Sequence, residues 1–452
     1  MTWLAALALP LLLLFVGRGF GRHLAEPAQG AAYRALVHFL AGLIAWHLVL
    51  NLLSLAGIPW SRTVLILALL VLIAVPRLAF GRARGPAPTG PGGERGEAAP
   101  PGALGWGDGI AAAAVLAFAL LAATLWITTP DFFYHWGLKG EHFFLARGID
   151  YRWLAESWNA GIHPDYPNLL PELYATTAVL AGRFAAPAQM LWSALFLGFT
   201  IVAAREAMVR GAARGASRFA EQATVALVAL AAVAYGIGFV MAGGADSMMA
   251  LALIASLPPL LGLSGGADGP QIGLAAAFAA SSKLEGLPLA AFLIVVYLAG
   301  LLRSKRGAWR ETAIRRAAAW VVLPTVAVVA PWLLAVQRHG LFQSASNSGP
   351  FDWERGRVIF PAMLSAIGAG ELHGLPWLVA LLPIAWLRRR TRPFAAVATA
   401  QLLFYAWAYF ASSLEPHFYV LSNFARLVFH LLPAVIVAVV LATEPEPTRR
   451  SS

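Results

Sequence analysis

Residues 108–128, DGIAAAAVLAFALLAATLWIT, form an almost unbroken apolar run, and the charged, aromatic stretch TPDFFYHWGLKGEHFF follows it at 129–144. A helix of about 20 apolar residues is long enough to cross the hydrocarbon core of a bilayer. Comparable runs recur along the chain without the period-2 alternation of membrane β-barrel strands. Because lipid offers the backbone no hydrogen-bond partner, these runs must be helical. The sequence therefore predicts an all-α, polytopic membrane helical bundle.

Composition and charge support this fold class. Of the 452 residues, 59% are hydrophobic and 12% are charged, whereas soluble domains carry about 25% charged residues. The net charge is +11, but the basic residues lie in short loops between apolar runs, as the positive-inside rule describes. We therefore expect a lipid bilayer as a partner and no nucleic acid. The absence of cysteine excludes disulfides and thiolate metal sites.

The apolar runs predict about 13 membrane spans. Their ranges are 2–17, 33–55, 62–80, 108–128, 187–204, 222–241, 246–263, 271–282, 286–302, 317–337, 374–387, 394–413 and 422–442. A shorter apolar stretch, 168–184, is expected to form a half-helix or a helix on the membrane surface. Partial spans persist only inside protein or beside a water-filled cavity, so this stretch indicates a cavity wall.

The chain is expected to have four parts. Residues 1–80 form three N-terminal transmembrane helices, and residues 81–107, rich in proline and glycine, form a disordered cytoplasmic linker. Residues 108–443 form the transmembrane core with a long outer loop at 129–167, and 444–452 form a cytoplasmic tail. The basic loops are placed in the cytoplasm, which puts the long loop outside. We expect a multi-pass protein of the cell inner (plasma) membrane whose active site faces the outer, periplasmic side.

The outer loop holds the first candidate site residues. Its length is typical of a lid or a binding loop rather than a simple turn. Asp131 is expected either to end the preceding helix or to act as a site acid, and Lys139 is a candidate partner for a phosphate. The neighbouring phenylalanines are expected to form an interfacial aromatic belt. They are Phe132, Phe133, Phe143 and Phe144.

The next candidates lie in IHPDYPNLLP and GGAD. In the first stretch, Asp165 is expected either to cap the helix that follows or to act as a second site acid. His163 and Tyr166 are candidates for orienting a polar ligand at the rim. In the second stretch, Asp246 follows two glycines at the start of a span, where it is either an N-cap or an acid lining a cavity.

The last candidates are charged groups inside or beside spans, which usually pair with one another or face a cavity. Lys283 and Glu285 separate two short apolar stretches. Lys283 either extends to the interface or binds a phosphate. Arg426 lies about one turn inside the last predicted span, with His417 nearby at the end of that span. Arg426 therefore either pairs with a carboxylate or binds an anion.

The order of these pieces resembles the GT-C superfamily of membrane glycosyltransferases, which includes protein O-mannosyltransferases and bacterial family-39-like proteins. The similar features are a span ending at Asp131, a long outer loop with Trp136 and Lys139, then HPDYPNLLP, and GGAD opening a later span. SSKLEGLP resembles the TKxEG segment of bacterial members, and NFARLVFHLLP resembles their final helix. The resemblance covers about 108–442.

The resemblance implies transfer of a sugar from a polyprenyl-phosphate carrier to a lipid, glycan or protein acceptor, with inversion. Asp131 would be the general base, and Lys139, Lys283 or Arg426 would stabilise the departing phosphate. A second acid often follows the first directly in the family. Phe132 stands there in this chain, so Asp165 is the other candidate catalytic acid. We predict no metal and no cofactor.

Other classes stay open. An oligosaccharide polymerase or ligase also has many helices and a large outer loop. A lipid or small-molecule transporter or flippase would show inverted repeats and charges near the midplane of several spans. A non-catalytic membrane scaffold is the third alternative. The glycosyltransferase interpretation predicts that Asp131, Lys139, Lys283 and Arg426 line one outward cavity.

Overall fold

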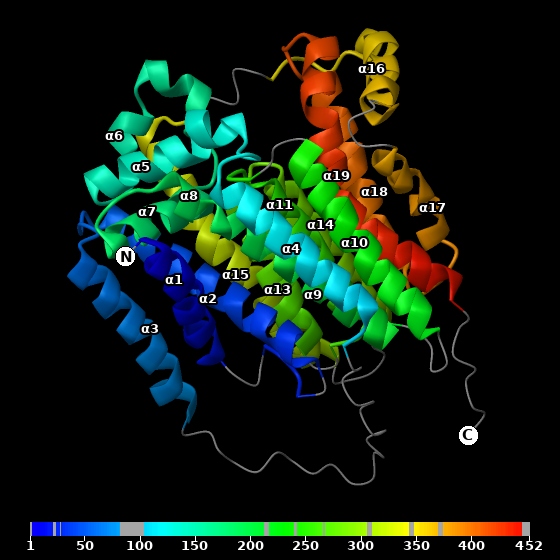
Figure 1. The fold of residues 1–452 in the computed structure, drawn as a ribbon, viewed down its shortest axis with the longest axis horizontal. Helices are drawn as coiled ribbons and strands as arrows, with labels where there is room; N and C mark the ends of the chain where they lie inside the picture. Colours follow the sequence, from blue (N-terminus) through cyan, green and yellow to red (C-terminus); the bar gives the residue numbers. More distant parts are fainter. Residues whose placement is uncertain are drawn as a thin grey trace.

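The structure, a computed structural model, describes residues 2–20, 24–27, 29–81, 104–211, 217–238, 242–264, 267–304, 310–342, 348–368 and 374–444. These residues form helices and no β-strand (Figure 1). The helices are α1 (Thr2–Arg18), α2 (Ala31–Leu55), α3 (Arg62–Gly81), α4 (Trp106–Ala123), α5 (Gly137–Ala146), α6 (Tyr151–Leu154), α7 (Leu169–Ala181), α8 (Ala186–Gln189), α9 (Leu191–Gly211), α10 (Arg218–Gly238), α11 (Asp246–Ala255), α12 (Leu257–Leu260), α13 (Asp268–Ser282), α14 (Gly286–Ser304), α15 (Arg310–His339), α16 (Gly356–Gly368), α17 (Leu382–Ala385), α18 (Arg392–Phe410) and α19 (Pro416–Thr443).

Eight helices of the described residues are long and apolar enough to cross a membrane, so the chain is a helical membrane bundle. They are Ala31–Leu55, Trp106–Ala123, Ala186–Gly211, Arg218–Ile237, Gly286–Arg303, Ala317–His339, Arg392–Phe410 and Pro416–Thr443. The predicted number of about 13 spans is not confirmed. Several predicted spans fold as shorter helices, such as Asp246–Leu260 and Leu375–Ala385. In Leu375–Ala385, Pro376 lies in the first turn of a 3₁₀ segment and Pro383 in the first turn of the α-helical segment that follows.

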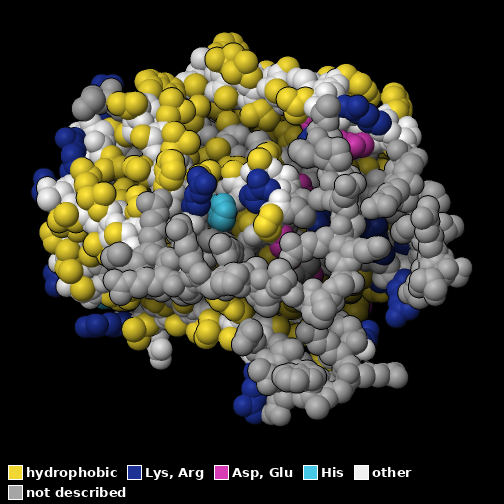
Figure 2. Space-filling view, turned by 90° about the horizontal axis from the view of Figure 1, so that it is seen from below, with side chains coloured by type: hydrophobic (Ala, Val, Ile, Leu, Met, Phe, Trp, Pro, Cys, Tyr) yellow, Lys and Arg dark blue, Asp and Glu magenta, His cyan; other side chains and the backbone are white. Residues whose placement is uncertain are grey.

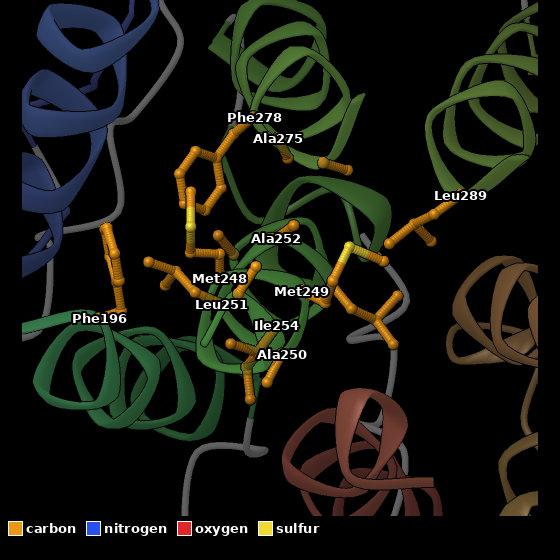
Figure 3. Packing of buried hydrophobic residues seen from close by; sticks show 14 of the residues in the cluster. Phe196, Met248, Met249, Ala250, Leu251, Ala252, Ile254, Ala275, Phe278 and Leu289 are labelled. Atoms are coloured by element: carbon orange, nitrogen blue, oxygen red, sulfur yellow. The ribbon is translucent and has the colours of Figure 1, made fainter. Parts of the chain in front are cut away.

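The short helix α11 forms the centre of the bundle. All ten of its residues are buried, and it packs against α9, α13 and α19. Figure 3 shows its side chains between Phe196 of α9, Phe278 of α13 and Leu289 of α14. A helix that is apolar on every face can be enclosed by lipid or by protein, and the burial of every residue of α11 shows that protein encloses it. The first residue of this buried helix, Asp246, is therefore held inside the protein.

The N-terminal helices pack on the rest of the bundle. Helix α2 lies against α1 and also against α9, α13 and α15. The contact between α1 and α2 is very close, because a Cβ added at Gly42 would lie 1.8 Å from the carbonyl oxygen of Leu13. Most of the linker predicted at 81–107 lies outside the described residues.

Helix α7 has 13 residues, which corresponds to about 20 Å and is shorter than a bilayer core. Its first ten residues are buried, and it packs against α5. Glu172 in its first turn accepts a hydrogen bond from Asn51 at 2.9 Å and lies 2.6 Å from His47, so α2 holds α7 through buried polar groups. The structure thus contains the short helix expected at 168–184.

The two ends of the bundle differ. One end carries α5, α6, α7 and α16 (Figure 1). At the other end, Arg388 donates to the carbonyl of Ala442, and Arg205 pairs with Asp108 at the start of α4. Seen from below, this end carries Lys and Arg side chains among hydrophobic ones (Figure 2). Arg390 also donates to the carbonyl of Gly211 at the end of α9, so the basic stretch at 388–392 lies at this end of the bundle.

Candidate functional site

A backbone pairing places Asp131 beside the start of α11. The segment after α4 forms a bridge between Thr128 and Ala242, and the Thr129 N–H donates to the Ala242 carbonyl at 2.9 Å. Asp131 follows this bridge by three residues and is the N-cap residue of the π-helix Phe132–Trp136, whereas Asp246 follows the bridge by four residues. The two aspartates therefore lie close together although they are far apart in the sequence.

The GGAD stretch turns sharply before α11. Gly243 adopts φ +90°, a conformation that side chains disfavour. Its carbonyl accepts a hydrogen bond from the Tyr174 hydroxyl at 3.0 Å, and its N–H donates to Ser193 at 2.9 Å. These contacts to α7 and α9 fix the turn. The N-cap residue of α11 is Ala245, and Asp246 is the first helical residue, with a side chain that is 1% exposed.

Lys283 approaches Asp246 from the break between α13 and α14. Helix α13 ends where Lys283 becomes extended, and α14 restarts at Gly286. A Cβ added at Gly286 would lie 1.8 Å from the carbonyl oxygen of Ala279, so only glycine permits this reversal. The Lys283 Nζ lies 3.0 Å from Asp246 Oδ1 and 3.7 Å from Glu285 Oε1.

Helix α19 completes the arrangement. Arg426 Nη2 lies 2.5 Å from Asp131 Oδ2 and 2.8 Å from Asp246 Oδ2. One turn later on the same face, His430 Nε2 lies 2.9 Å from Asp246 Oδ1. The other ring nitrogen of His430 lies 2.8 Å from the hydroxyl of Tyr405 on α18.

We call Asp131, Asp246, Lys283, Glu285 and Arg426 the ion-pair cluster. Its members differ in exposure: the side chain of Asp246 is 1% exposed, that of Arg426 is 19% exposed and that of Asp131 is 33% exposed. Ion pairs removed from water are stable only when further hydrogen bonds satisfy them, and Asp246 receives three partners. The cluster therefore has a buried part around Asp246 and an accessible edge at Asp131.

These contacts decide between several of the sequence alternatives. Asp246 is a cluster acid and not an N-cap. Lys283 pairs with Asp246, and its side chain is 10% exposed. Arg426 pairs with two carboxylates, as one of its alternatives predicted. Asp165 does not cap α7, whose N-cap residue is Asn168.

A second polar group lies under the loop before α7. Lys139 is completely buried; its Nζ donates to the carbonyl of His163 at 2.6 Å and lies 5.8 Å from the ring centre of Trp136. Burial lowers the pKa of Lys139 to about 7, although the negative charge of Asp165 opposes the shift. Lys139 thus fastens the loop on which His163 and Tyr166 lie, with their rings stacked at 4.6 Å.

The pKa values of His135 and Tyr166, which lie near Lys139, are also shifted by charges of the ion-pair cluster. Burial lowers the pKa of His135, and the charges of Lys139, Lys283 and Arg426 lower it further. Burial likewise raises the pKa of Tyr166, with added effects from the carboxylates of Glu285 and Asp131. His135 is therefore neutral at pH 7. Both rings lie within the electrostatic reach of the cluster.

The structure separates two predicted site residues from the ion-pair cluster. Lys139 contacts the 163–168 loop, so it does not join Asp131, Lys283 and Arg426. His417 is exposed at the first turn of α19, where its backbone N–H donates to Glu415. The sequence interpretation also missed His430 and Tyr405. The spacing of four residues between Arg426 and His430 on one apolar helix was the signal that identifies the first of them.

Part of the predicted aromatic belt is wrong. Phe132 is 2% exposed and Phe143 is fully buried, because their rings pack against Tyr174 of α7 and Trp60 between α2 and α3. Phe133 is exposed and remains available for an interface. Among the described residues, no three His, Asp or Glu side chains form a group that could hold a metal ion.

Comparison with known proteins identifies no relative. No protein family, no curated protein and no solved structure matches this chain. The arrangement of the described residues is thus the basis for assigning a function.

Proposed function

We propose that this chain is a membrane glycosyltransferase that moves a sugar from a polyprenyl-phosphate carrier to a lipid, glycan or protein acceptor. The observation that carries the proposal is the position of Arg426 between two unequal carboxylates. Asp246 is its permanent, buried partner. Asp131, at the accessible edge, is a partner that an incoming phosphate can replace. Ionisable groups that converge between membrane helices are usually functional.

The proposed reaction needs a base and a cation next to each other. Asp131 takes the proton of the acceptor hydroxyl, whose oxygen forms a bond to the sugar C1. The bond between C1 and the phosphate oxygen breaks, and its electron pair goes to the phosphate. Asp131 loses its negative charge on protonation as the departing phosphate gains one. Arg426 therefore changes its partner from Asp131 to the phosphate. The net charge of the site stays constant.

Asp246, His430 and Lys283 support this exchange. The Asp246 carboxylate holds Arg426 at 2.8 Å and Lys283 at 3.0 Å, so both cations are in place before a donor binds. The hydrogen bonds from Tyr405 through His430 to Asp246 orient that carboxylate. Such preorganisation lowers the reorganisation needed when charge develops. We assign Asp246 and His430 as positioning residues.

Asp165 and Lys139 receive a different role from the one the resemblance implied. Lys139 is buried and bound to the loop, so we propose that it shapes the acceptor side rather than binding phosphate. The negative charge of Asp165 interacts with Lys139. We therefore propose Asp131 alone as the general base. The basic residues at the opposite end of the bundle favour an outer, periplasmic location of the ion-pair cluster in the cell inner membrane. We propose that the reaction uses neither a metal nor a cofactor.

Native mass spectrometry of the purified protein tests the proposal. Wild-type protein in lipid nanodiscs should retain added polyprenyl phosphate. Arg426→Gln should lose it, because the guanidinium that pairs with the phosphate is gone. Arg338→Gln, a change of the same kind outside the cluster, is the matched control and should bind normally. Equal retention by wild type and Arg426→Gln would contradict the proposal and favour a transporter, polymerase or scaffold.

A further inference from the structure

One face of helix α18 carries three polar side chains that point into the bundle. Gln401, Tyr405 and Tyr409 are spaced four residues apart and share one face, and each is at most 1% exposed. Polar groups within a membrane bundle require partners there. Tyr405 has one in His430, and the Gln401 Nε2 donates to the backbone carbonyl of Glu285 at 3.1 Å. These side chains therefore face the ion-pair cluster.

Three oxygen atoms in this region have no hydrogen-bond partner among the described residues. They are Gln401 Oε1, Glu285 Oε2 and the Tyr409 hydroxyl oxygen, and all three are buried. Buried polar atoms in folded proteins are nearly always paired, with protein, water or a ligand. Gln401 and Glu285 are already joined through the Glu285 carbonyl. This region therefore has unused hydrogen-bonding capacity beside Lys283.

The chemistry of these atoms selects the kind of ligand. The free oxygens of Gln401 and Glu285 only accept hydrogen bonds, so the ligand must supply donors. The Lys283 Nζ lies 3.7 Å from the other carboxylate oxygen of Glu285, so that oxygen already has a cationic partner. Hydroxyl groups supply the donors that the unused oxygens require.

The position of the three oxygens fits a ligand whose phosphate is held by the ion-pair cluster. Lys283 pairs with Asp246, and Glu285 is two residues further along the chain. The Tyr409 ring packs edge-to-face on Tyr419 at 4.9 Å, which adds an aromatic surface beside the polar atoms. Aromatic rings next to hydrogen-bonding side chains are suited to the mixed apolar and hydroxyl faces of a pyranose.

We propose that Glu285, Gln401 and Tyr409 bind the hydroxyl groups of the sugar that the polyprenyl phosphate carries. This inference rests on the proposed function and adds to it the residues that recognise the sugar. Gln401 and Tyr409 acquire a role in donor binding that the ion pairs do not give them. The substrate class is a pyranose with free hydroxyl groups.

The test compares the binding of two lipids to the full-length protein in nanodiscs. One is polyprenyl phosphate, and the other is the same lipid carrying a hexose. The near-isosteric variants Gln401→Met and Tyr409→Phe should bind the sugar-free lipid like wild type. The ratio of the affinity for the hexose-bearing lipid to that for the sugar-free lipid should be about 3- to 10-fold lower than in wild type, the effect of one lost hydrogen bond. A lipid whose hexose lacks the hydroxyl group that Tyr409 binds should have the same affinity for wild type and for Tyr409→Phe.

Tyr33→Phe is the matched control, since it removes a buried tyrosine hydroxyl that bonds to the Ala255 carbonyl in a separate polar group. It should leave the binding of both lipids unchanged. An unchanged preference for the hexose-bearing lipid in Gln401→Met and Tyr409→Phe overturns the sugar site alone. Failure of wild type to bind either lipid overturns the proposed function and the sugar site together.

Discussion

The guanidinium of Arg426 lies 2.5 Å from the carboxylate of Asp131 and 2.8 Å from that of Asp246, although the sequence separations are 295 and 180 residues. The two contacts have different surroundings, because Asp131 is one-third exposed and Asp246 is buried. Loss of an exposed partner is inexpensive, whereas loss of a buried one leaves a charge unpaired. This difference separates a reacting acid from a positioning acid.

Asp131→Asn should separate catalysis from donor binding. Asparagine keeps the size of the side chain but cannot accept a proton at neutral pH, so sugar transfer should fall about 10²- to 10⁴-fold. Polyprenyl phosphate should bind at least as well as to wild type, since a competing negative charge next to Arg426 is gone. Initial transfer rates and lipid affinities check this. Equal losses of rate and affinity would indicate a binding role for Asp131.

Asp246→Asn should destabilise the bundle. The change removes the buried carboxylate that Lys283 and Arg426 share, so each cation keeps one partner, Glu285 or Asp131. Breaking a buried ion pair costs about 3–5 kcal/mol. Thermal unfolding in detergent should show a lower midpoint. Adding Lys283→Met should recover part of the loss, because one of the two cations that lose a carboxylate is removed. Strictly additive effects of the two changes would contradict the coupling.

Lys139→Met should alter how stability depends on pH. The folded pKa of Lys139 is about 7 and lies below its unfolded value, so the unfolded chain binds more protons between pH 7 and about 10. Lys139 therefore makes the free energy of unfolding rise with pH in this window, by up to roughly 1.4 kcal/mol per pH unit. Below pH 7 it adds no pH dependence, because the lysine is protonated in both the folded and the unfolded chain. The stability difference between wild type and Lys139→Met should follow this course. A constant difference from pH 6 to 10 would refute the shifted pKa.

The N-terminal helices should remain attached without a covalent connection. Helix α2 packs against α9, α13 and α15, and Glu172 joins it to α7. Fragments 1–92 and 93–452, expressed together, should therefore copurify in mild detergent. Glu172→Leu should weaken their association, since His47 and Asn51 lose a buried partner. Glu354→Leu, at an exposed residue, is the control. Separation of the unmodified fragments would show that the connecting segment is required.

The sequence predicted the helical class and much of the candidate site for identifiable reasons. Apolar runs determine membrane helices directly, so both ends of α2 and α14 were placed within about two residues. Charges inside or beside such runs are costly, which identified Asp246, Lys283 and Arg426 before any contact was known. Those three residues lie together in the structure.

Other features depend on packing, which residue patterns do not contain. The predicted number of about 13 spans is not confirmed, because an apolar run such as 246–263 has the same pattern whether it crosses lipid or is enclosed by protein, as α11 is. Lys139 was grouped with the phosphate partners by charge alone, but the fold buries it against His163. Tyr405 carries no charge, so only its contact with His430 reveals that it is connected to Asp246.

The most direct test of the central claim is sugar transfer by purified protein reconstituted in liposomes. Polyprenyl phosphates carrying labelled hexoses or pentoses are the donors, and an extract of envelope lipids and glycans supplies the acceptors. Wild type should release sugar-free polyprenyl phosphate and label an acceptor, with the anomeric configuration inverted, and Asp131→Asn should not. Movement of the donor across the membrane without cleavage of its sugar, at the same rate in both proteins, would contradict the account.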